Sequence, residues 1–507
     1  MTAARPLVGD QPGRQAVARR VLWTVFVGAF LVIGGWSISN PLMAAPDEPA
    51  HAVKAAATVR LQFSADESEY NPGRGTFEVP ALFAQIWQVP CFGFQPETAA
   101  SCFTGFDGDL ARPSESTSHV ARYNPVYYAL VGLPSLAGSS EVTLYAMRLV
   151  GAALNALLVA LAARTVAELR RWHWPAAALV ASLTPMTFFV FSSLTPQGPE
   201  IAGAAVTWLL LLALTREPDD ALLTQRMWRL VVASGLFVIA RGLSPAYLLL
   251  VIAAVVLAAP RPAVVLDLVR NSRIWPQIAA CAALAVAGVV YTLASGSLAL
   301  GIVLPDETLT ARGVVRTMLG NTSAYLEQLL GVFGWGDTHL SLWTLLLAGS
   351  VVLLVLLVGL AFGTLRERLA VGAVVVATFL LPIVVQLQSF RETGMVWQGK
   401  YVMPLAIGAL LIAGFGAERE PMTAAVARPL LRAVVAVVAV VQVTAVAVNL
   451  HRNVNGVNGS WFTVTSESWT PPGGPVLWLV VQALLWAGVL VLAWRVTRRP
   501  LEGDRPE

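Results

Sequence analysis

The chain contains an uncharged apolar stretch, LSLWTLLLAGSVVLLVLLVGLAFG, over residues 340–363. A membrane-spanning helix needs about 20 mostly apolar residues to cross ~30 Å of hydrocarbon, so this stretch predicts a span. With further segments of the same kind, the sequence predicts an all-α, polytopic membrane protein of about 12 transmembrane helices. The expected spans are 21–39, 141–163, 175–193, 200–215, 229–243, 244–260, 275–298, 340–363, 369–389, 401–416, 432–450 and 475–494.

Two of these segments, 229–243 and 244–260, meet at Gly242 and Pro245. Since Gly and Pro interrupt helices, the pair can form two short spans or one broken helix. The sequence leaves both arrangements open.

The composition excludes several classes of protein. Of 507 residues, 56% are hydrophobic and 13% are charged, about half the ~25% charged residues usual in soluble domains. A soluble core could not bury that many apolar side chains, which excludes a soluble enzyme. The formal charge of +4, without a basic cluster interleaved with aromatic residues, excludes a nucleic-acid partner.

Arginines indicate the orientation in the membrane. Arg19 and Arg20 precede the first span, and the short loops expected inside carry further arginines. The positive-inside rule therefore predicts a multi-pass plasma-membrane protein with both termini in the cytoplasm. We expect a cytoplasmic tail at 1–20, a main transmembrane region at 21–405 with an outer loop at 40–140, C-terminal transmembrane helices at 406–496, and a cytoplasmic tail at 497–507.

The three cysteines have different surroundings. Cys91 and Cys102 lie eleven residues apart in the expected outer loop, an oxidising location in most bacteria, so a disulfide there is favoured over two unpaired thiols. Cys281 lies inside an apolar span and is expected to be a small buried side chain.

The densest group of chemically active residues follows the first span, with PDEPAHAVK over 46–54. Pro46 and the two acids suit the first turn of a helix. On such a helix Asp47, Glu48 and His51 share a face that Lys54 extends by one turn. A carboxylate there can deprotonate a hydroxyl, and the Asp47–Glu48 pair can hold a divalent cation against a phosphate. The alternative is a simple helix N-terminus with acids that favour the dipole.

A tyrosine-rich stretch, RYNPVYY over 122–128, precedes a short apolar run. It predicts an interfacial helix, because aromatic side chains settle at the headgroup level. Its residues Arg122, Tyr123 and Tyr127 either line a lipid-facing groove or only anchor the helix.

Arg148 lies inside the second span, about 10 Å from its outer end at 1.5 Å per residue. An unpaired guanidinium in hydrocarbon is costly, so Arg148 needs a partner. That partner is either a phosphate, onto which arginine forks, or an acid such as Asp47 or Glu48. Arg241, beside the Gly and Pro, invites the same two interpretations.

Two later outer loops carry polar motifs. The first, GWGDTH over 334–339, presents Asp337 on a turn. The second, RETGMVWQGKY over 391–401, contains one of only two lysines, Lys54 and Lys400; both are expected on the outer side, either for a compact charge on a phosphate or as snorkelling anchors. The candidates in this second loop are Arg391, Gln398, Lys400 and Tyr401.

These motifs together resemble a bacterial membrane protein family, the domain of unknown function 2142 family. PDEPAH at 46–51 is the most specific landmark, and the motifs at 123–128, 334–338 and 398–401 follow in order, with Arg148 between them. The resemblance runs from about residue 40 to 405. The family usually has Gln-Gly-Arg-Tyr where this chain has Lys400, which keeps the charge. It usually has Asn-Pro-Asp where this chain has TPQ at 195–197, which loses a carboxylate.

The layout of that family is similar to the GT-C glycosyltransferases, which carry an acidic motif in the first outer loop. The resemblance implies a transferase that moves a sugar from a polyprenyl-phosphate donor to an envelope glycan, lipid or protein. Asp47 would be the general base, with Glu48 assisting or both acids binding Mg or Mn, while His51 and Lys54 orient groups or neutralise charge. The residues expected to bind the lipid phosphate or other parts of the substrates are Lys54, Arg122, Tyr123, Tyr127, Arg148, Asp337, Arg391, Gln398, Lys400 and Tyr401.

Two other functions stay open at this point. One is a transporter or flippase of a lipid-linked glycan, and the other is a non-catalytic partner in envelope assembly. A transferase needs the carboxylate of Asp47, whereas a flippase should tolerate Asp47→Asn and fail without Arg148. An assembly partner should survive both changes.

Overall fold

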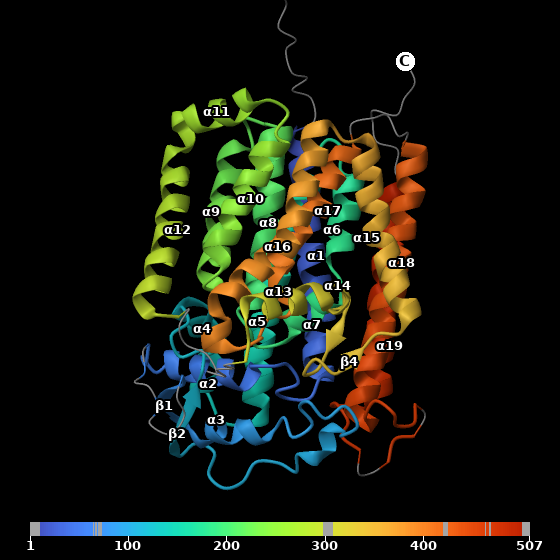
Figure 1. Cartoon of the computed structure of the whole chain (residues 1–507). Coiled ribbons are helices and arrows are strands. Elements are labelled where there is room, and N and C mark those ends of the chain that lie inside the picture. Colours follow the sequence, from blue (N-terminus) through green and yellow to red (C-terminus); the bar gives the residue numbers. More distant parts are fainter. Residues whose placement is uncertain are drawn as a thin grey trace, which may run out of the picture.

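The computed structural model describes residues 11–498 except for 64, 66–67, 69–72, 298–307, 419–423, 462 and 466–467. The expected tails therefore lie largely outside the described residues, although residues 11–20 already belong to the first helix. The chain is an all-α polytopic membrane protein with a small lobe at one end of a helical bundle (Figure 1).

Within the described residues, nine helices are long and apolar enough to cross a membrane. Their bounds are α1 (Gln11–Ser39), α5 (Glu141–Ala167), α8 (Gln197–Arg216), α12 (Trp275–Ser295), α15 (Leu342–Phe362), α16 (Leu365–Thr393), α17 (Met403–Ala417), α18 (Ala424–Asn455) and α19 (Pro475–Arg498).

The other three expected spans are also helical. Segment 175–193 is a pair, α6 (His173–Ser182) and α7 (Pro185–Ser192), bent by 62°; counted as one span, it brings the total in the described chain to ten. Segments 229–243 and 244–260 are two separate helices rather than one, α9 (Leu223–Ala240) and α10 (Ser244–Ala258). Pro occupies the first turn of both α7 and α10, where its missing N–H costs nothing.

Burial differs strongly among these helices. In α8, 94% of the 18-residue apolar window is buried, against 6% in the helix that contains α12. Small residues allow close packing at the centre: Gly408 of α17 lies against the indole of Trp208 on α8, and Gly359 of α15 lies against Ala413 of α17. The outer faces of the peripheral helices present exposed leucine and valine, as expected for contact with lipid.

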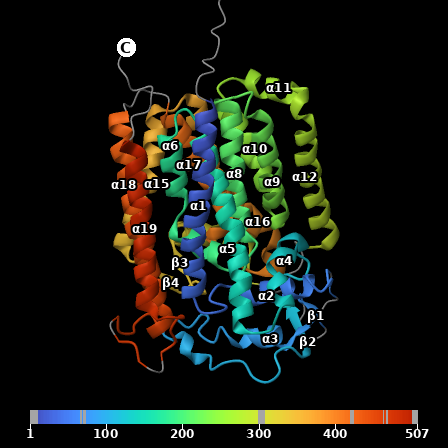
Figure 2. The ribbon, with the colours of Figure 1, turned by 180° about the vertical axis from the view of Figure 1, so that it is seen from behind.

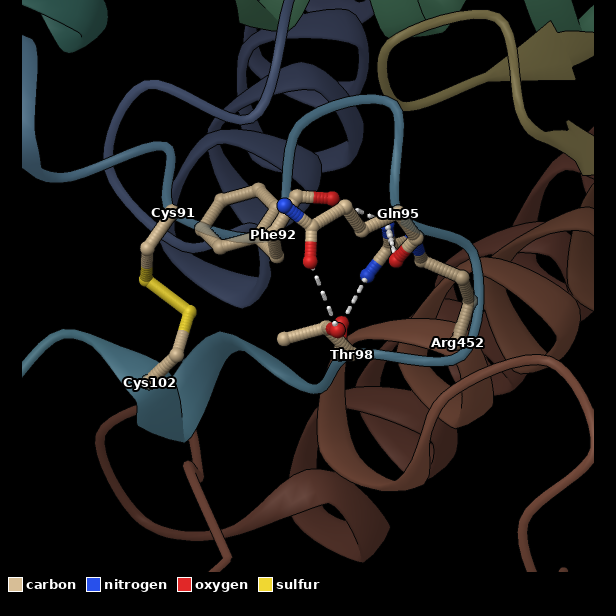
Figure 3. The surroundings of a disulfide bond; sticks show 6 residues. All are labelled: Cys91, Phe92, Gln95, Thr98, Cys102 and Arg452. Atoms are coloured by element: carbon tan, nitrogen blue, oxygen red, sulfur yellow. Dashed lines mark hydrogen bonds between the residues drawn. A yellow bond between two sulfur atoms is a disulfide. The ribbon is translucent and has the colours of Figure 1, made fainter.

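The lobe consists of short elements between α1 and α5. The helices are α2 (Glu48–Thr58), α3 (Ala81–Gln85) and α4 (Pro125–Val131), and the strands β1 (Gly75–Pro80) and β2 (Pro113–Ser118). The strands pair antiparallel, from Gly75 opposite Ser118 to Pro80 opposite Pro113. The lobe has its own apolar core, and Cys91 and Cys102 form a disulfide within it (Figure 3).

Further short elements connect the spans. These are α11 (Pro262–Arg270), α13 (Ala311–Gly320), α14 (Thr322–Leu330), the paired strands β3 (Val332–Phe333) and β4 (Thr338–His339), and 3-10 turns at Ile86–Gln88, Ala100–Cys102, Leu133–Leu136, Ser272–Ile274 and Gly399–Val402. Seen from behind, α1 and α5 run side by side into the lobe, which is where the candidate site lies (Figure 2).

Candidate active site

The two acids of the PDEPAH motif point to different places because of the backbone between them. Asp47 precedes α2 and has a φ of 65°, in the left-handed region, and the helix begins at Glu48 rather than at Pro46. A left-handed residue turns the chain sharply, so neighbouring side chains diverge. Asp47 contacts the lobe, whereas Glu48 contacts the bundle.

Glu48 and Arg148 form a buried ion pair, with side chains 1% and 3% exposed. Arg148 Nε and Nη2 donate to the two carboxylate oxygens of Glu48 at 2.7 and 2.6 Å. The remaining donors bind the carbonyls of Ser37, Asn40 and Pro41 at 2.8 to 3.1 Å. All five guanidinium N–H groups are thereby used. Of the two interpretations of Arg148 that the sequence left open, the structure shows pairing with an acid.

The arrangement does not fit a two-carboxylate metal site. Both oxygens of Glu48 are bound to Arg148, and one also accepts the backbone N–H of Leu194 at 3.0 Å. The described residues contain no group of three or more His, Cys, Asp or Glu side chains placed to hold a metal ion. Asp47 is left as a single carboxylate.

Asp47 pairs with His119, a residue that the sequence analysis did not single out. His119 follows β2, and its Nε2 lies 3.1 Å from Asp47 Oδ1. The side chain of His119 is 13% exposed and that of Asp47 41% exposed. Desolvation, which would raise the pKa of Asp47, is outweighed by the hydrogen bond and charge of His119 and by other nearby cations, so this pKa lies well below its usual value. Asp47 is therefore ionised and accessible.

His51 lies beside this pair but is a neutral group. Its Nδ1 and the Tyr128 hydroxyl are joined by a 2.8 Å hydrogen bond, and the two rings stack with centroids 5.9 Å apart. Burial lowers the pKa of His51 to about 3. Tyr123 packs on the other side, with ring centroids 6.2 Å apart. At neutral pH His51 therefore takes part as a hydrogen-bonding group without a charge.

Two cations, one of them the chain neighbour of Tyr401, lie near the ring of this tyrosine. The guanidinium of Arg241, between α9 and α10, lies 4.5 Å from the ring centroid, and Lys400 Nζ lies 6.0 Å from it. Arg241 Nη1 lies 3.6 Å from Glu200 Oε2. Lys400, only 9% exposed, has no hydrogen-bond or ion-pair partner for its ammonium group among the described residues.

The backbone around Lys400 is fixed from three sides. Gln197, in the TPQ stretch that replaces the usual motif, donates to the Lys400 carbonyl at 2.7 Å. The Tyr247 hydroxyl donates to the Tyr401 carbonyl at 2.8 Å, and the Gly399 N–H donates to Gln328. Lys400 and Asp47 are close enough that the positive charge helps to lower the pKa of Asp47. The Lys400 side chain thus lies largely buried near Asp47, and its ammonium group has no partner in the part of the chain that the structure describes.

One of the remaining candidates borders this cluster, because the ring of Tyr127 contacts that of Tyr128 with centroids 5.3 Å apart. Lys54 donates to the Phe63 carbonyl at 2.9 Å inside the lobe, and burial lowers its pKa to about 8. Tyr127 is buried on α4, and Asp337 pairs with Arg452 at 2.7 Å. The other three make no polar side-chain contact within the described chain: Arg122 and Gln398, both half-buried, and Arg391, which is exposed at the end of α16.

The structure therefore brings together five predicted residues: Asp47, His51, Tyr123, Lys400 and Tyr401. It adds His119, Tyr128 and Glu200, and makes Arg241 a member of the site. One signal for His119 was available, because the chain has only five histidines and this one lies three residues before Arg122. The pairing of Glu200 with Arg241 had no local signal.

Together, the bundle and this polar cluster define a class: a polytopic membrane protein with a carboxylate and buried cations at the junction of membrane and lobe. The chain belongs to the predicted membrane protein family DUF2142, whose pattern matches residues 30–409.

Two solved structures are similar in overall shape. Both are ArnT from Cupriavidus metallidurans, one bound to undecaprenyl phosphate and one in the apo state. The TM-scores are 0.44 and 0.42 at 13% and 14% sequence identity, and each alignment covers 94% of this chain and 77% of the ArnT chain. No match was found among curated proteins.

Proposed function

We propose that this protein is a GT-C-like membrane glycosyltransferase that moves a sugar from a polyprenyl-phosphate donor to a cell-envelope acceptor on the outer face. The observation that carries the proposal is the largely buried Lys400, whose ammonium has no partner among the described residues and lies close to the ionised carboxylate of Asp47. An uncompensated buried charge is costly, and such a group is retained where a ligand of opposite sign completes it.

The position of Lys400 favours an anionic lipid as that ligand. Lys400 precedes α17, an apolar spanning helix, so its charge lies at the boundary between hydrocarbon and lobe. A polyprenyl phosphate has its phosphate at this depth while its chain stays in the membrane. Arg241, whose guanidinium lies 4.5 Å from the centroid of the Tyr401 ring, is a second cation that can bind the same phosphate.

The chemistry that fits this arrangement is a displacement at the anomeric carbon of the sugar. Asp47, kept ionised beside His119, accepts the proton of the acceptor hydroxyl. The hydroxyl oxygen forms the new bond to the anomeric carbon as the bond from that carbon to the phosphate oxygen breaks. Lys400 and Arg241 stabilise the negative charge that develops on the departing phosphate. The configuration at the anomeric carbon is inverted.

The test compares Lys400→Met with Lys400→Arg in purified protein. We expect Lys400→Met to weaken binding of undecaprenyl phosphate about 10- to 100-fold, the range of a lost charge-assisted contact. Lys400→Arg keeps the charge and should retain binding and transfer of radiolabelled sugar from polyprenyl-phosphate donors. Equal binding by wild type and Lys400→Met would contradict the proposal. Binding without transfer, unaffected by Asp47→Asn, would favour a flippase instead.

A further inference from the structure

Helix α18, the last but one in the described chain, places one arginine against the lobe. The Arg452 side chain is 1% exposed, and it lies beyond residue 409, where the family match ends. Its Nη1 donates to the Thr98 carbonyl, and its Nη2 donates to the Phe92 and Gln95 carbonyls, at 2.8 to 3.2 Å. These carbonyls belong to the loop that the Cys91–Cys102 disulfide closes, as Figure 3 shows. Arg452 thus donates hydrogen bonds to three carbonyls spread along this loop.

The same guanidinium binds the turn at 334–338. Arg452 Nη2 lies 2.7 Å from Asp337 Oδ2, and Nε lies 3.4 Å from Oδ1. The turn has positive φ at Gly334 and Gly336, which places Trp335 between them against the disulfide loop. The Trp335 ring packs on Phe94, with centroids 5.1 Å apart. Arg452 therefore fixes both the loop and the turn that carries Trp335.

Trp335 connects this assembly to the candidate active site. Its Nε1 donates to the Met43 carbonyl at 3.1 Å. Met43 has a φ of 58° and Asp47 a φ of 65°, so the segment between them holds two residues in a conformation that only surrounding contacts maintain. At the start of the same segment, Asn40 accepts a hydrogen bond from Asn449, one turn before Arg452 on α18. Helix α18 thus acts on the chain before Asp47 directly, through Asn449 and Asn40, and indirectly, through Arg452, Asp337 and Trp335.

We infer that Arg452 is a positioning residue for Asp47, acting through Asp337, Trp335 and the Met43 carbonyl. Helix α18 is then part of the site, although it lies beyond the residues that match the family. The expected effect on sugar transfer rests on the proposed function, whereas the chain of contacts from Arg452 to Met43 does not. Loss of the link displaces the Asp47 carboxylate, and displacements of about 1 Å cost on the order of 100-fold in rate.

Hydrogen–deuterium exchange of the full-length protein in lipid nanodiscs tests the link without any activity. Arg452→Gln removes the clamp, and Trp335→Phe removes only the N–H to Met43 while keeping an aromatic ring against Phe94. We expect both variants to raise exchange at 43–48 about threefold to tenfold, the effect of one lost hydrogen bond. The matched control is Arg432→Gln, which breaks a bond from α18 to Thr497 far from the lobe and should leave 43–48 unchanged.

The inference is overturned if Arg452→Gln raises exchange only in the loop at 91–102 and not at 43–48. A positioning role also predicts that both variants lower transfer about 10- to 100-fold while undecaprenyl phosphate binds as in wild type. A purely structural role would instead lower binding and transfer together. If the wild type transfers no sugar, the proposed function fails, and the exchange data still decide whether Arg452 acts on the Asp47 segment.

Discussion

At the scale of single residues, Asp47 and Glu48 show that neighbours in one motif can have unrelated roles. The left-handed backbone at Asp47 directs its carboxylate to His119, and the next carboxylate turns to Arg148. One acid is accessible and the other is locked inside. In the proposed reaction the accessible acid is therefore Asp47, while Glu48 is held in the ion pair with Arg148.

His119→Gln should shift the pH dependence of transfer. In the wild type, the hydrogen bond and charge of His119 hold the pKa of Asp47 below its usual value, so its carboxylate stays ionised as the pH falls. Without His119 that pKa rises, and the acid limb of the kcat/KM profile moves to higher pH. The matched control is His339→Gln, an exposed histidine paired with Glu327, which should leave the profile in place. An unchanged acid limb in His119→Gln would contradict this role.

Arg148→Met should destabilise the fold by about 3–5 kcal/mol, since it leaves the carboxylate of Glu48 buried without a counter-charge. The double variant Arg148→Met with Glu48→Gln removes both charges and should recover part of that loss. Thermal unfolding in detergent measures both effects. Arg391→Met, at an exposed site, serves as the control. A stable Arg148→Met that binds undecaprenyl phosphate poorly would instead make Arg148 a phosphate ligand.

The sequence identified Asp47 and Lys400, because unusual residues stood beside recognisable motifs. It could not decide between the two partners of Arg148, since Glu48 lies 100 residues away and a phosphate satisfies a guanidinium equally well. His119 and the Glu200–Arg241 pair were missed for a related reason. Their contacts join segments that only the tertiary fold brings together, and no local spacing reports such contacts.

At the scale of elements, every segment expected to span the membrane is helical, because continuous hydrophobic runs are a strong signal. The expected number of twelve was too high for the described chain, in which nine helices, or ten with the bent pair, are long and apolar enough to span a membrane. The sequence did not predict how the helices are arranged on either side of an interruption by Gly or Pro. The 62° bend between α6 and α7 occurs within an expected single span, where Thr184 caps α7 and Pro185 begins it. At Gly242 and Pro245 the same kinds of residue separate two distinct helices. Packing against neighbours, which the sequence does not contain, decides between these outcomes.

The disulfide-closed loop should contribute measurably to stability. Cys91 and Cys102 are eleven residues apart, and replacing both by Ser removes the cross-link between them. The free energy of unfolding should fall by about 3 kcal/mol, because the unfolded chain gains conformational entropy. Thermal unfolding with and without reductant measures this change, and Cys281→Ser should respond to reductant as the wild type does. If reductant lowers the melting temperature of the Cys91→Ser/Cys102→Ser protein as much as that of the wild type, another cause is responsible.

At the scale of the whole molecule, the lobe and the outer ends of α1 and α5 lie at one end of the bundle, and α11 lies at the other (Figure 1). The C-terminal end of α19 lies at the same end of the bundle as α11, opposite the lobe. This arrangement agrees with the charge distribution of the sequence, in which Arg261, Arg270 and Arg273 surround α11. The lobe and the Asp47 site are then expected on the outer face.

Topology reporters test this orientation. A green fluorescent protein fused after residue 507 should fluoresce, because it folds in the cytoplasm. Alkaline phosphatase fused after Gly474, between α18 and α19, should be active outside. Positive-inside charge is the physical reason for both results. A C-terminal fusion without fluorescence, together with inactive phosphatase at Gly474, would show the opposite orientation, with the Asp47 site in the cytoplasm.

The most direct test of the central claim is sugar transfer by purified protein. Wild type and Asp47→Asn are given radiolabelled polyprenyl-phosphate sugars and envelope acceptor, and undecaprenyl phosphate binding is measured in parallel. We predict transfer by the wild type and a loss of about 100- to 10,000-fold in Asp47→Asn, the range for a missing general base, with binding retained. Transfer by Asp47→Asn at the wild-type rate would contradict the account.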